Sequence, residues 1–446
     1  MTDVALSPEG SSKTPRVSFW TLGCRLNQYD TAALRARILD SGFAEVPAGS
    51  ADADVVFVNT CTVTARADQE ARQLVRRLHR TRPKARIVVT GCYAQRAPEE
   101  LRALPGVTAV LGSAERDDAE SVMRAAAGET PWVRVGAARA IRDFKTAAPL
   151  LVGRSRALLK IQDGCDSFCT YCIVPYVRGR SRSLPPGEVL ERARRLLETG
   201  FSEIVLTGAD LGGYGRDLGG TGALAGLVQA LLGLGARHRV RLSSIEPNKV
   251  DPVLAGLIGS EPRLCRHLHV PLQSGSNRIL RAMRRGYTRE EYAALVSGVS
   301  ARGPVGIGAD VIVGFPGEGE AQFQETYDFL EGSPITFLHV FRYSPRPGTV
   351  AARLGAGVPE AGARERAERL RALGEAKSDA FRRSLIDSTV PVVMESGRGT
   401  RGPIAMSDVY VPVELDRDPD RRDGIHLARV EGVSGGRLVG SIAATG

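Results

Sequence analysis

The stretch Cys165-Asp166-Ser167-Phe168-Cys169-Thr170-Tyr171-Cys172 places three cysteines within eight residues. Clustered thiolates bind zinc, copper(I) or iron-sulfur clusters, and structural zinc normally takes a fourth Cys or His that lies close in the sequence. The nearest His on either side are His79 and His238, and the next cysteine is Cys265, so this loop supplies three ligands. A [4Fe-4S] cluster held by three cysteines leaves one iron open to a substrate. We therefore expect such a cluster at this loop, with a zinc site that takes a distant fourth ligand as the alternative.

The composition indicates a globular, soluble protein. The chain has 446 residues, and its 7 cysteines are too few for a disulfide scaffold, which favours a reducing, cytoplasmic location. Residues 1–14 lack the features of a signal peptide and are expected to form a disordered tail. The longest apolar run, near 222–236, is too short to cross a bilayer. The net charge of +10 favours a polyanionic partner such as nucleic acid, although an Arg-rich composition can also reflect genomic base content.

Strand and helix patterns alternate over residues 15–130. Apolar strands are predicted at 16–22, 54–59 and 86–90, and helical periodicity follows at 31–41, at 68–82 and from about 98. Repeated strand-helix units indicate a doubly wound parallel sheet in an N-terminal α/β domain.

Three more cysteines follow the three predicted strands of this domain. Cys24, Cys61 and Cys92 each come directly after a strand, and the carboxyl ends of parallel strands meet at one edge of a sheet. Gly23 and Gly91 precede two of them and allow a close backbone approach to a bulky group. We therefore expect a second metal-binding set of thiolates, with three ordinary buried cysteines as the alternative.

Residues 131–153 are expected to be a linker, after which a second α/β series begins. Strands are predicted at 157–161, 203–206, 240–243, 267–271, 309–313 and 335–341, with helices between them. Six such units predict a partial (β/α)6 barrel over 154–360, with its chemistry at the carboxyl ends of the strands. The loop of Cys165 lies at that position.

Other loops at the strand ends are candidates for cofactor contact. They contain Gly208, Glu246, Gln273 and Gly314, where small residues admit a cofactor and a carboxylate can accept from hydroxyl groups. The glycine-rich run 212–226 lacks the Gly-Lys-Ser/Thr ending of a phosphate loop. Cys265 is expected to be a buried structural thiol.

The C-terminal part changes in character. Residues 361–383 are charged and helical, and are expected to form a bridge. Short alternating strands then predict a small antiparallel β-barrel over 384–446. Small barrels often bind RNA, and a purely stabilising module is the alternative.

Five further motifs lie near the cysteines and at the strand ends. They are Thr21-Leu22-Gly23-Cys24-Arg25-Leu26-Asn27-Gln28-Tyr29, Asn59-Thr60-Cys61-Thr62-Val63-Thr64, Gly91-Cys92-Tyr93-Ala94-Gln95, His269-Val270-Pro271-Leu272-Gln273-Ser274-Gly275-Ser276 and Tyr343-Ser344-Pro345-Arg346-Pro347-Gly348-Thr349. With the spacing of the Cys165 loop and the order of the domains, they resemble the radical S-adenosylmethionine (SAM) methylthiotransferase family across nearly the whole chain. The resemblance is to the branch that modifies threonylcarbamoyladenosine in tRNA.

The resemblance implies a function and its cofactors. One [4Fe-4S] cluster on Cys165, Cys169 and Cys172 would bind SAM and generate a radical, and a second on Cys24, Cys61 and Cys92 would carry the sulfur. A methylthio group would be added to carbon 2 of threonylcarbamoyladenosine, with SAM as both radical source and methyl donor and no catalytic residue beyond the cluster ligands.

The implied partners are the tRNA anticodon stem-loop, a flavodoxin-type or ferredoxin-type electron donor and no membrane, and the C-terminal barrel would be a TRAM-like RNA-binding domain. The alternatives are the same chemistry on isopentenyladenosine in tRNA, methylthiolation of an aspartate in a ribosomal protein, and a non-catalytic RNA-binding metalloprotein.

Two expectations about RNA follow. Several arginines flank the cysteine loops and are candidates for contact with the RNA backbone, with ordinary surface solvation as the alternative. These are Arg66, Arg72, Arg76, Arg178, Arg180 and Arg182. Removal of the chain from Ser384 onward should weaken tRNA binding while SAM cleavage persists.

Overall fold

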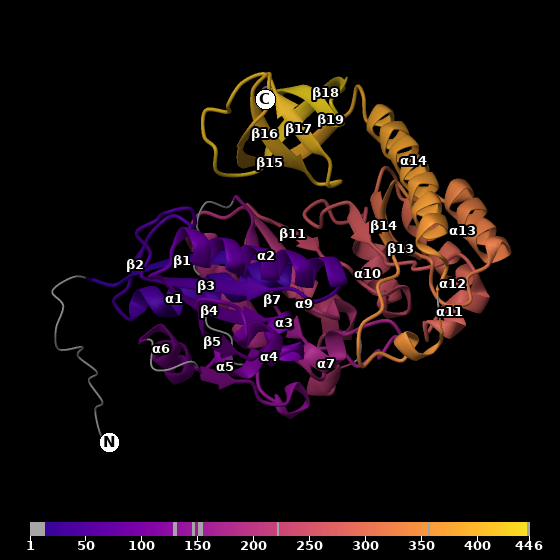
Figure 1. Ribbon diagram of the computed structural model, residues 1–446. Helices are drawn as coiled ribbons and strands as arrows, with labels where there is room; N and C mark the ends of the chain where they lie inside the picture. Colours follow the sequence, from indigo (N-terminus) through magenta and orange to yellow (C-terminus); the bar gives the residue numbers. More distant parts are fainter. Residues whose placement is uncertain are drawn as a thin grey trace. The chain divides into compact units, whose positions relative to one another are not determined.

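The computed structural model describes residues 14–127, 132–144, 148–149, 155–220, 223–355 and 357–443. The tail expected over 1–14 therefore lies outside the described residues except for Thr14, and so does about a third of the expected linker 131–153. The chain forms two compact units. Unit 1 consists of Met1–Ile141, Lys145–Leu150 and Tyr176–Arg178, and unit 2 of Arg142–Phe144, Leu151–Pro175 and Gly179–Gly446 (Figure 1).

Unit 1 is built on a parallel sheet of six strands in the order β2-β1-β3-β4-β5-β6. The strands are β1 (Arg16–Thr21), β2 (Ala44–Glu45), β3 (Val55–Thr60), β4 (Arg86–Gly91), β5 (Val107–Leu111) and β6 (Trp132–Arg134). The predicted doubly wound sheet is confirmed, and β6 extends it into the segment that we expected to be a linker.

Helices cover both faces of this sheet. They are α1 (Arg25–Asp40), α2 (Ala65–Thr81), α3 (Cys92–Arg96), α4 (Pro98–Arg102), α5 (Ser113–Arg116) and α6 (Ala119–Ala127). Because side chains alternate along a strand, Val56 and Val58 of β3 pack with α2, while Val55 and Phe57 pack with α1 and α6. Helix α2 begins where the hydroxyl of Thr64 accepts a hydrogen bond from the Ala67 amide at 3.1 Å.

Unit 2 contains the predicted six β/α units. Strands β7 (Ala157–Lys160), β10 (Glu203–Thr207) and β11 (Arg239–Leu242) form one parallel sheet, and β12 (His267–His269), β13 (Gly306–Val313) and β14 (Phe337–Arg342) form another. An isolated parallel pair between Val240 and Leu264 continues β11 toward β12. The helices are α7 (Val174–Arg178), α8 (Pro186–Glu198), α9 (Ala223–Leu232), α10 (Pro252–Leu257), α11 (Asn277–Ala282), α12 (Arg289–Ser300) and α13 (Glu320–Gly332). This is the expected partial barrel, with an additional antiparallel pair β8 (Gln162–Asp163) and β9 (Arg182–Ser183).

The C-terminal part of unit 2 forms the predicted small barrel, although one of its strand pairs is parallel and not antiparallel. Helix α14 (Glu360–Ser384) leads into a closed barrel of five strands in the order β15-β16-β17-β19-β18 (Figure 1). The strands are β15 (Thr389–Arg398), β16 (Pro403–Ser407), β17 (Pro412–Leu415), β18 (His426–Ser434) and β19 (Arg437–Ile442). Among the described residues, no helix is long and apolar enough to cross a membrane.

A buried ionic cluster joins this small barrel to the partial barrel. Glu203, the first residue of β10, is fully buried and accepts from the guanidinium groups of Arg239 at 2.7 Å and Arg241 at 2.6 Å on β11. The other guanidinium N–H groups of these arginines donate to backbone carbonyls of the small barrel, at Pro391, Met406, Ser407 and Asp408, over 2.8–3.0 Å. The small barrel therefore satisfies buried charges that belong to the partial barrel.

The turn after β16 closes the amino-terminal end of the partial barrel. Arg266 pairs with Asp408 at 2.6 Å, and the ring of Tyr410 lies 4.6 Å from that of His267, measured between centroids. Gly306, the first residue of β13, faces the carbonyl of Val409 so closely that a Cβ would collide with it. Removal of the chain from Ser384 onward would break these contacts, so they argue against the expectation that SAM cleavage persists after this truncation.

Candidate metal and cofactor site

Cys165, Cys169 and Cys172 lie on the loop that follows β7 and β8, at the carboxyl end of the first barrel strand. The amide of Cys165 donates to the Gly179 carbonyl at 3.1 Å, and that of Cys172 donates to the Cys169 carbonyl at 3.0 Å. Gly164 has a φ of 72°, and a Cβ there would collide with the Arg180 carbonyl. The loop therefore needs glycine immediately before its first cysteine.

The thiols of this loop are shielded from water. Cys165 and Cys169 are each 8% exposed, and burial raises the pKa of Cys165 to about 11 and that of Cys172 to about 12. Arg285 Nη1 lies 3.0 Å from the Cys169 Sγ atom, and the Ser167 amide lies 3.4 Å from the Cys165 Sγ atom. The free loop therefore holds neutral thiols, and a bound metal must displace their protons.

A network of charged side chains adjoins the loop. Glu246 accepts from Arg285 at 2.6 Å, from Lys249 at 2.7 Å and from the Ser167 hydroxyl at 3.0 Å. Lys249 also pairs with Asp210 at 2.7 Å. Burial would raise the pKa of Glu246, but the charges of Arg285 and Lys249 outweigh that effect and hold it below its ordinary value. Glu246 is thus an ionised carboxylate at the cysteine loop.

The structure places the four predicted cofactor residues in different surroundings. Glu246 belongs to the charged network, and Gly208 packs against the side chain of Gln162, 2.8 Å from where its Cβ would lie. Gln273 has a φ of 69° and donates its amide to the Asp310 carbonyl at 2.8 Å. Gly314 has a φ of 80° and faces the Cβ of Ala363, so packing alone accounts for this glycine. Their contact with a cofactor stays a prediction.

Sequence reasoning missed Lys249 and Arg285, although they are central to the network. Their side chains are only 6% and 4% exposed, and buried charges need partners. Asp210 lies in the loop of Gly208, which the sequence analysis identified as a candidate for cofactor contact. Glu246 lies only three residues before Lys249, but the pairs Lys249–Asp210 and Arg285–Glu246 each join residues 39 positions apart, and the sequence carries no signal for them.

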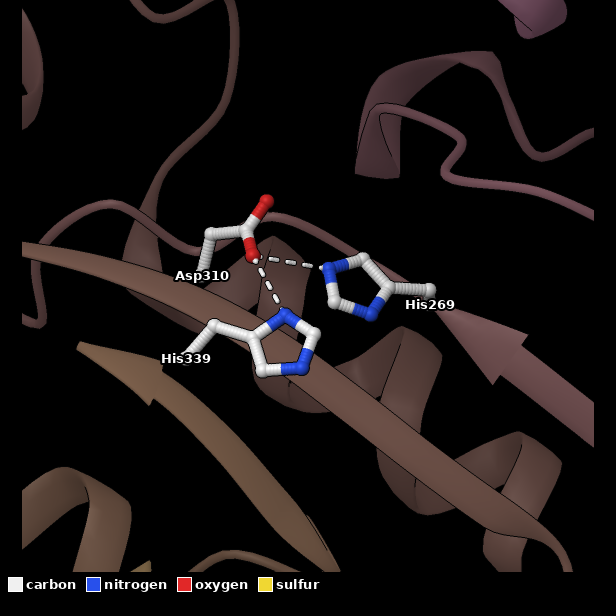
Figure 2. A group of neighbouring side chains, drawn as sticks. All are labelled: His269, Asp310 and His339. Carbon is white, nitrogen blue, oxygen red and sulfur yellow. Dashed lines mark hydrogen bonds and ion pairs between the residues drawn. The ribbon is translucent and has the colours of Figure 1, made fainter. Parts of the chain in front are cut away.

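A second polar cluster, also missed, lies inside the partial barrel. Asp310 Oδ1 accepts from His269 Nε2 at 2.9 Å and from His339 Nδ1 at 3.2 Å. Figure 2 shows that both imidazoles point at this single carboxylate oxygen. Burial would raise the pKa of Asp310, but the hydrogen bonds from the two histidines outweigh it and lower the pKa. Because both rings converge on one oxygen, this arrangement is a hydrogen-bonded trio around an ionised carboxylate.

Strand alternation places the trio on the inner side of the barrel. Val311 and Val313 of β13 pack in the core with helix residues such as Leu330, so Asp310 faces the opposite side. The space beside Gly308 on that side is filled by the ring of Phe337 and by His269, with which a Cβ would collide. His339 is the accessible member, with 54% of its side chain exposed.

The second set of cysteines gathers at the carboxyl edge of the sheet in unit 1. Cys24 precedes α1, Cys61 follows β3, and Cys92 follows β4 as the first residue of α3, while β1, β3 and β4 are neighbours in the sheet. A Cβ on Gly23 would lie 2.6 Å from the Cys61 Cβ. The predicted convergence of the three cysteine loops is therefore found in the structure.

Two of the cysteines in this second set, Cys61 and Cys92, are buried, and the guanidinium of Arg178 lies beside Cys92. Burial raises the pKa of Cys61 to about 12, and nearby Cys92 and Cys24 add to the rise. Burial also raises the pKa of Cys92, against the opposing effect of the Arg178 guanidinium. Arg178 is 3% exposed and is held by Asn27 at 2.7 Å and Asp30 at 3.0 Å.

Each set supplies three thiols, and thiolates are the ligands of iron-sulfur clusters. A cubane spreads its ligands over separate iron atoms, so three cysteines would leave one iron open. Cys265 is 2% exposed, with its Sγ atom 4.0 Å from Glu203, and belongs to neither set.

The arginines that we expected to contact RNA fall into two groups. Arg178 and Arg182 are buried and engaged with protein groups, so they are unavailable to phosphates and that expectation was wrong. Arg66 and Arg180 are exposed but paired with Glu70 and Asp166. Arg72 donates to the Tyr93 hydroxyl at 2.7 Å, and Arg76 is exposed.

Comparison with known proteins adds the family. Residues 16–112 match the model of the uncharacterized protein family UPF0004, and residues 159–330 match the Radical SAM superfamily. The threonylcarbamoyladenosine tRNA methylthiotransferase MtaB of Aquifex aeolicus is 40% identical, over 82% of this chain and 89% of the relative. Its Bacillus subtilis counterpart is 38% identical over 85% and 84%. A tRNA-2-methylthio-N(6)-dimethylallyladenosine synthase of a Parafrankia species is 36% identical over 85% and 78%.

Solved structures share the fold at low sequence identity. The radical SAM methyltransferase TsrM of Kitasatospora setae has a TM-score of 0.52 and 16% identity, and covers 75% of this chain and 77% of its own. The cobalamin-dependent radical SAM enzyme OxsB has a TM-score of 0.51 and 14% identity, over 80% and 56%. Membership of the Radical SAM superfamily implies SAM and a [4Fe-4S] cluster as cofactors. On the strength of the relatives that match it over most of their length, the chain belongs to the radical SAM methylthiotransferase family.

Proposed function

We propose that this enzyme adds a methylthio group to carbon 2 of threonylcarbamoyladenosine next to the anticodon of tRNA. The observation that carries the proposal is the presence of two separate sets of three cysteines, one at the edge of a parallel sheet and one at the carboxyl end of a barrel strand. Each set would hold a [4Fe-4S] cluster with one open iron. The relatives with the highest identities among those named above act on threonylcarbamoyladenosine according to their names.

The residues at the Cys165 loop suit a bound cofactor that carries charge. The cluster, when bound, supplies an electron for radical generation from SAM, which is chemistry that no side chain can perform. Around it the chain provides Glu246, a carboxylate able to accept from hydroxyl or ammonium groups, and the cations Lys249 and Arg285, which balance negative charge. Asp210 holds Lys249 in place at 2.7 Å. These side chains would orient the cofactor and exclude water from it.

A second cluster on Cys24, Cys61 and Cys92 would hold the sulfur that is transferred. Cys61 and Cys92 are buried, while Cys24 is exposed, so two of the three ligands would be shielded from water. Arg178 is the buried cation beside Cys92 and would offset part of the negative charge of a thiolate-bound cluster. A flavodoxin-type or ferredoxin-type protein would supply the electrons.

The same chemistry on dimethylallyladenosine is the second candidate, because relatives of that name are also similar. Nucleoside analysis separates the two. In a strain lacking the gene, digested tRNA should lose 2-methylthio-threonylcarbamoyladenosine and keep the 2-methylthio form of the dimethylallyl nucleoside, as seen by liquid chromatography and mass spectrometry. Loss of the dimethylallyl product instead would assign the second substrate.

A further inference from the structure

An open groove lies on unit 1 beside helix α2. It has a volume of about 610 Å³ and is lined by Trp20, Leu22, Glu70, Gln73, Leu74, Arg76, Arg77 and Arg80. Trp20 belongs to β1, and the remaining residues are Leu22 just after this strand and a flank of α2. We call this surface the Trp20 groove.

The groove exists because the sheet is incompletely covered on this face. Trp20 and Leu22 pack against the core beneath α2 but stay only partly buried. The next strand beyond β1 is β2, which has two residues, both exposed. Strand β2 pairs only with Arg16 and Val17 of β1, so Trp20 lies beyond the paired residues, where its ring stays partly exposed.

The charge of the groove is strongly positive. Arg76, Arg77 and Arg80 are exposed, and among the residues that the structure describes none of them takes part in an ion pair. One acidic residue, Glu70, lines the groove, and it is already paired with Arg66 at 2.9 Å. Three arginines on one helix flank that make no ion pair with a described carboxylate give the groove a positive potential, which favours an anionic ligand.

An aromatic platform lies among these cations. The guanidinium carbon of Arg77 lies 5.3 Å from the centroid of the Trp20 ring, a cation–π arrangement. The Trp20 Nε1 atom is buried and has no hydrogen-bond partner. Proteins bind single-stranded nucleotides by stacking the bases on aromatic rings and by placing cations along the phosphates. Each stacked base contributes about 1–3 kcal/mol to the binding free energy.

The groove is also close to the second set of cysteines. Trp20 precedes Cys24 by four residues, and four residues span at most ~14 Å of extended chain. A nucleotide in the groove would therefore neighbour a base presented to that set. We propose that the Trp20 groove binds an unpaired nucleotide of the tRNA anticodon loop, with Arg76 and Arg80 on its phosphates and its base stacked on Trp20 and Arg77. This proposal rests on the proposed function, because it assumes an RNA substrate.

Charge reversal tests the electrostatic part. The reconstituted holoenzyme carrying Arg76→Glu and Arg80→Glu should bind a fluorescent anticodon stem-loop RNA about tenfold more weakly, by anisotropy. The matched Ala variants should lower the magnitude of the salt-dependence slope by about 1.4, since each single-strand phosphate contact contributes ~0.7. SAM cleavage without RNA should be unchanged. Arg102→Glu is the control, because Arg102 is an exposed arginine of the same unit that is paired with Glu99 at 2.7 Å.

Tryptophan fluorescence tests the stacking part directly. The chain has two tryptophans, Trp20 and Trp132, so the variant Trp132→Phe reports on Trp20 alone. Titration with the stem-loop should quench this emission, and the quenching should be lost when Arg76 and Arg80 are replaced by Glu. If the RNA affinity of the Arg variants equals that of the wild type and Trp20 is not quenched, the proposal is overturned.

The outcomes separate this proposal from the proposed function. If wild-type enzyme binds the stem-loop through the groove but forms no methylthio nucleoside, the proposed reaction fails and the RNA site stands. If the Arg variants bind RNA normally but lose turnover with a flavodoxin-type donor, the groove is a docking site for that acidic protein and not for RNA.

Discussion

The six cysteines are the residues whose roles the sequence predicts best. Their thiolates belong to a small group of possible ligands, and three of them lie in one loop while the other three follow successive strands. Parallel topology alone then brings the second group together. By contrast, Lys249 and Arg285 acquire their roles from burial and from partners that are mostly distant in the chain, such as Asp210 for Lys249 and Glu246 for Arg285, and no local pattern encodes those pairs.

The two cysteine sets should separate by function. Replacing Cys24, Cys61 and Cys92 by Ala should leave reductive cleavage of SAM to deoxyadenosine measurable but abolish the methylthio product, because the sulfur would have no holder. Replacing Cys169 by Ala should abolish both, since two cysteines should not retain the cubane. Chromatography of deoxyadenosine and of digested tRNA nucleosides after incubation with dithionite and SAM measures both products.

Cys265→Ala is the matched control for these variants. This thiol is buried and belongs to neither set, so iron content and both products should stay near wild-type levels. Formation of the methylthio nucleoside by the triple variant would refute the sulfur-holding role of the first three cysteines.

The trio inside the barrel yields a prediction about stability. Asp310→Ala removes the acceptor of two imidazole N–H groups, one of them on the buried His269. A buried donor without a partner costs about 1–3 kcal/mol, so the urea midpoint should fall. Asp310→Asn keeps an acceptor oxygen and should fall less. Equal losses in the two variants would show that the hydrogen bonds from the histidines contribute little.

At the scale of elements, the sequence predicts strands better than helix starts. Helix α1 begins at Arg25, six residues before the predicted start, because its first turns bury the polar side chains Asn27 and Asp30 and show no apolar periodicity. The strands were identified because continuous apolar runs mark a parallel sheet buried on both faces. Polar residues such as Glu203 and Asp310 lie within the predicted strands, but their hydrogen-bond partners could not be predicted, since this requires the register of the sheet.

The pairing of β10 with β11 predicts a dependence of stability on pH. Burial raises the pKa of Glu203, but Arg241 and Arg239 outweigh burial and lower it to about 2. A folded pKa below the unfolded value of ~4.3 stabilises the fold above that pH, and the contribution is lost as the pH falls toward 2. Glu203→Gln should therefore lower the unfolding free energy at pH 7 by about 3–5 kcal/mol, because two buried arginines lose their partner.

The difference between wild type and Glu203→Gln should shrink as the pH falls below about 4, because Glu203 of the unfolded chain takes up a proton there while the folded protein keeps this carboxylate ionised until near pH 2. Thermal melting at pH 7, 5 and 3 measures it. Glu120→Gln is the control, since this glutamate is an exposed member of a surface pair with Arg124 at 3.9 Å and should change little at any pH. A gap that stays constant with pH would contradict the lowered pKa of Glu203.

At the scale of the whole molecule, the order and type of the parts could be predicted from the sequence, but their dependence on one another could not. Hydrophobic periodicity predicts a sheet, a partial barrel and a small closed barrel, but it carries no information about the contacts between these parts. The structure shows that Arg239 and Arg241 of the partial barrel complete their hydrogen bonds on backbone carbonyls of the small barrel. Such bonds join residues about 150 positions apart in the chain and leave no local trace in the sequence.

This dependence reverses the expected result of truncation. Deleting residues from Ser384 onward would leave the guanidinium groups of Arg239 and Arg241 without their carbonyl acceptors and would expose His267, which packs against Tyr410. Each unsatisfied buried donor costs about 1–3 kcal/mol, and several together approach the ~5–15 kcal/mol that stabilises a typical domain. We expect the truncated protein to lose SAM cleavage together with tRNA binding, or to aggregate. To test RNA binding by the small barrel without this damage, Arg398→Glu and Arg437→Glu should be made in the full chain. Arg398 pairs with Asp418 of the small barrel, and Arg437 begins its last strand. A truncated protein that melts like the wild type and still cleaves SAM would show that the junction is dispensable.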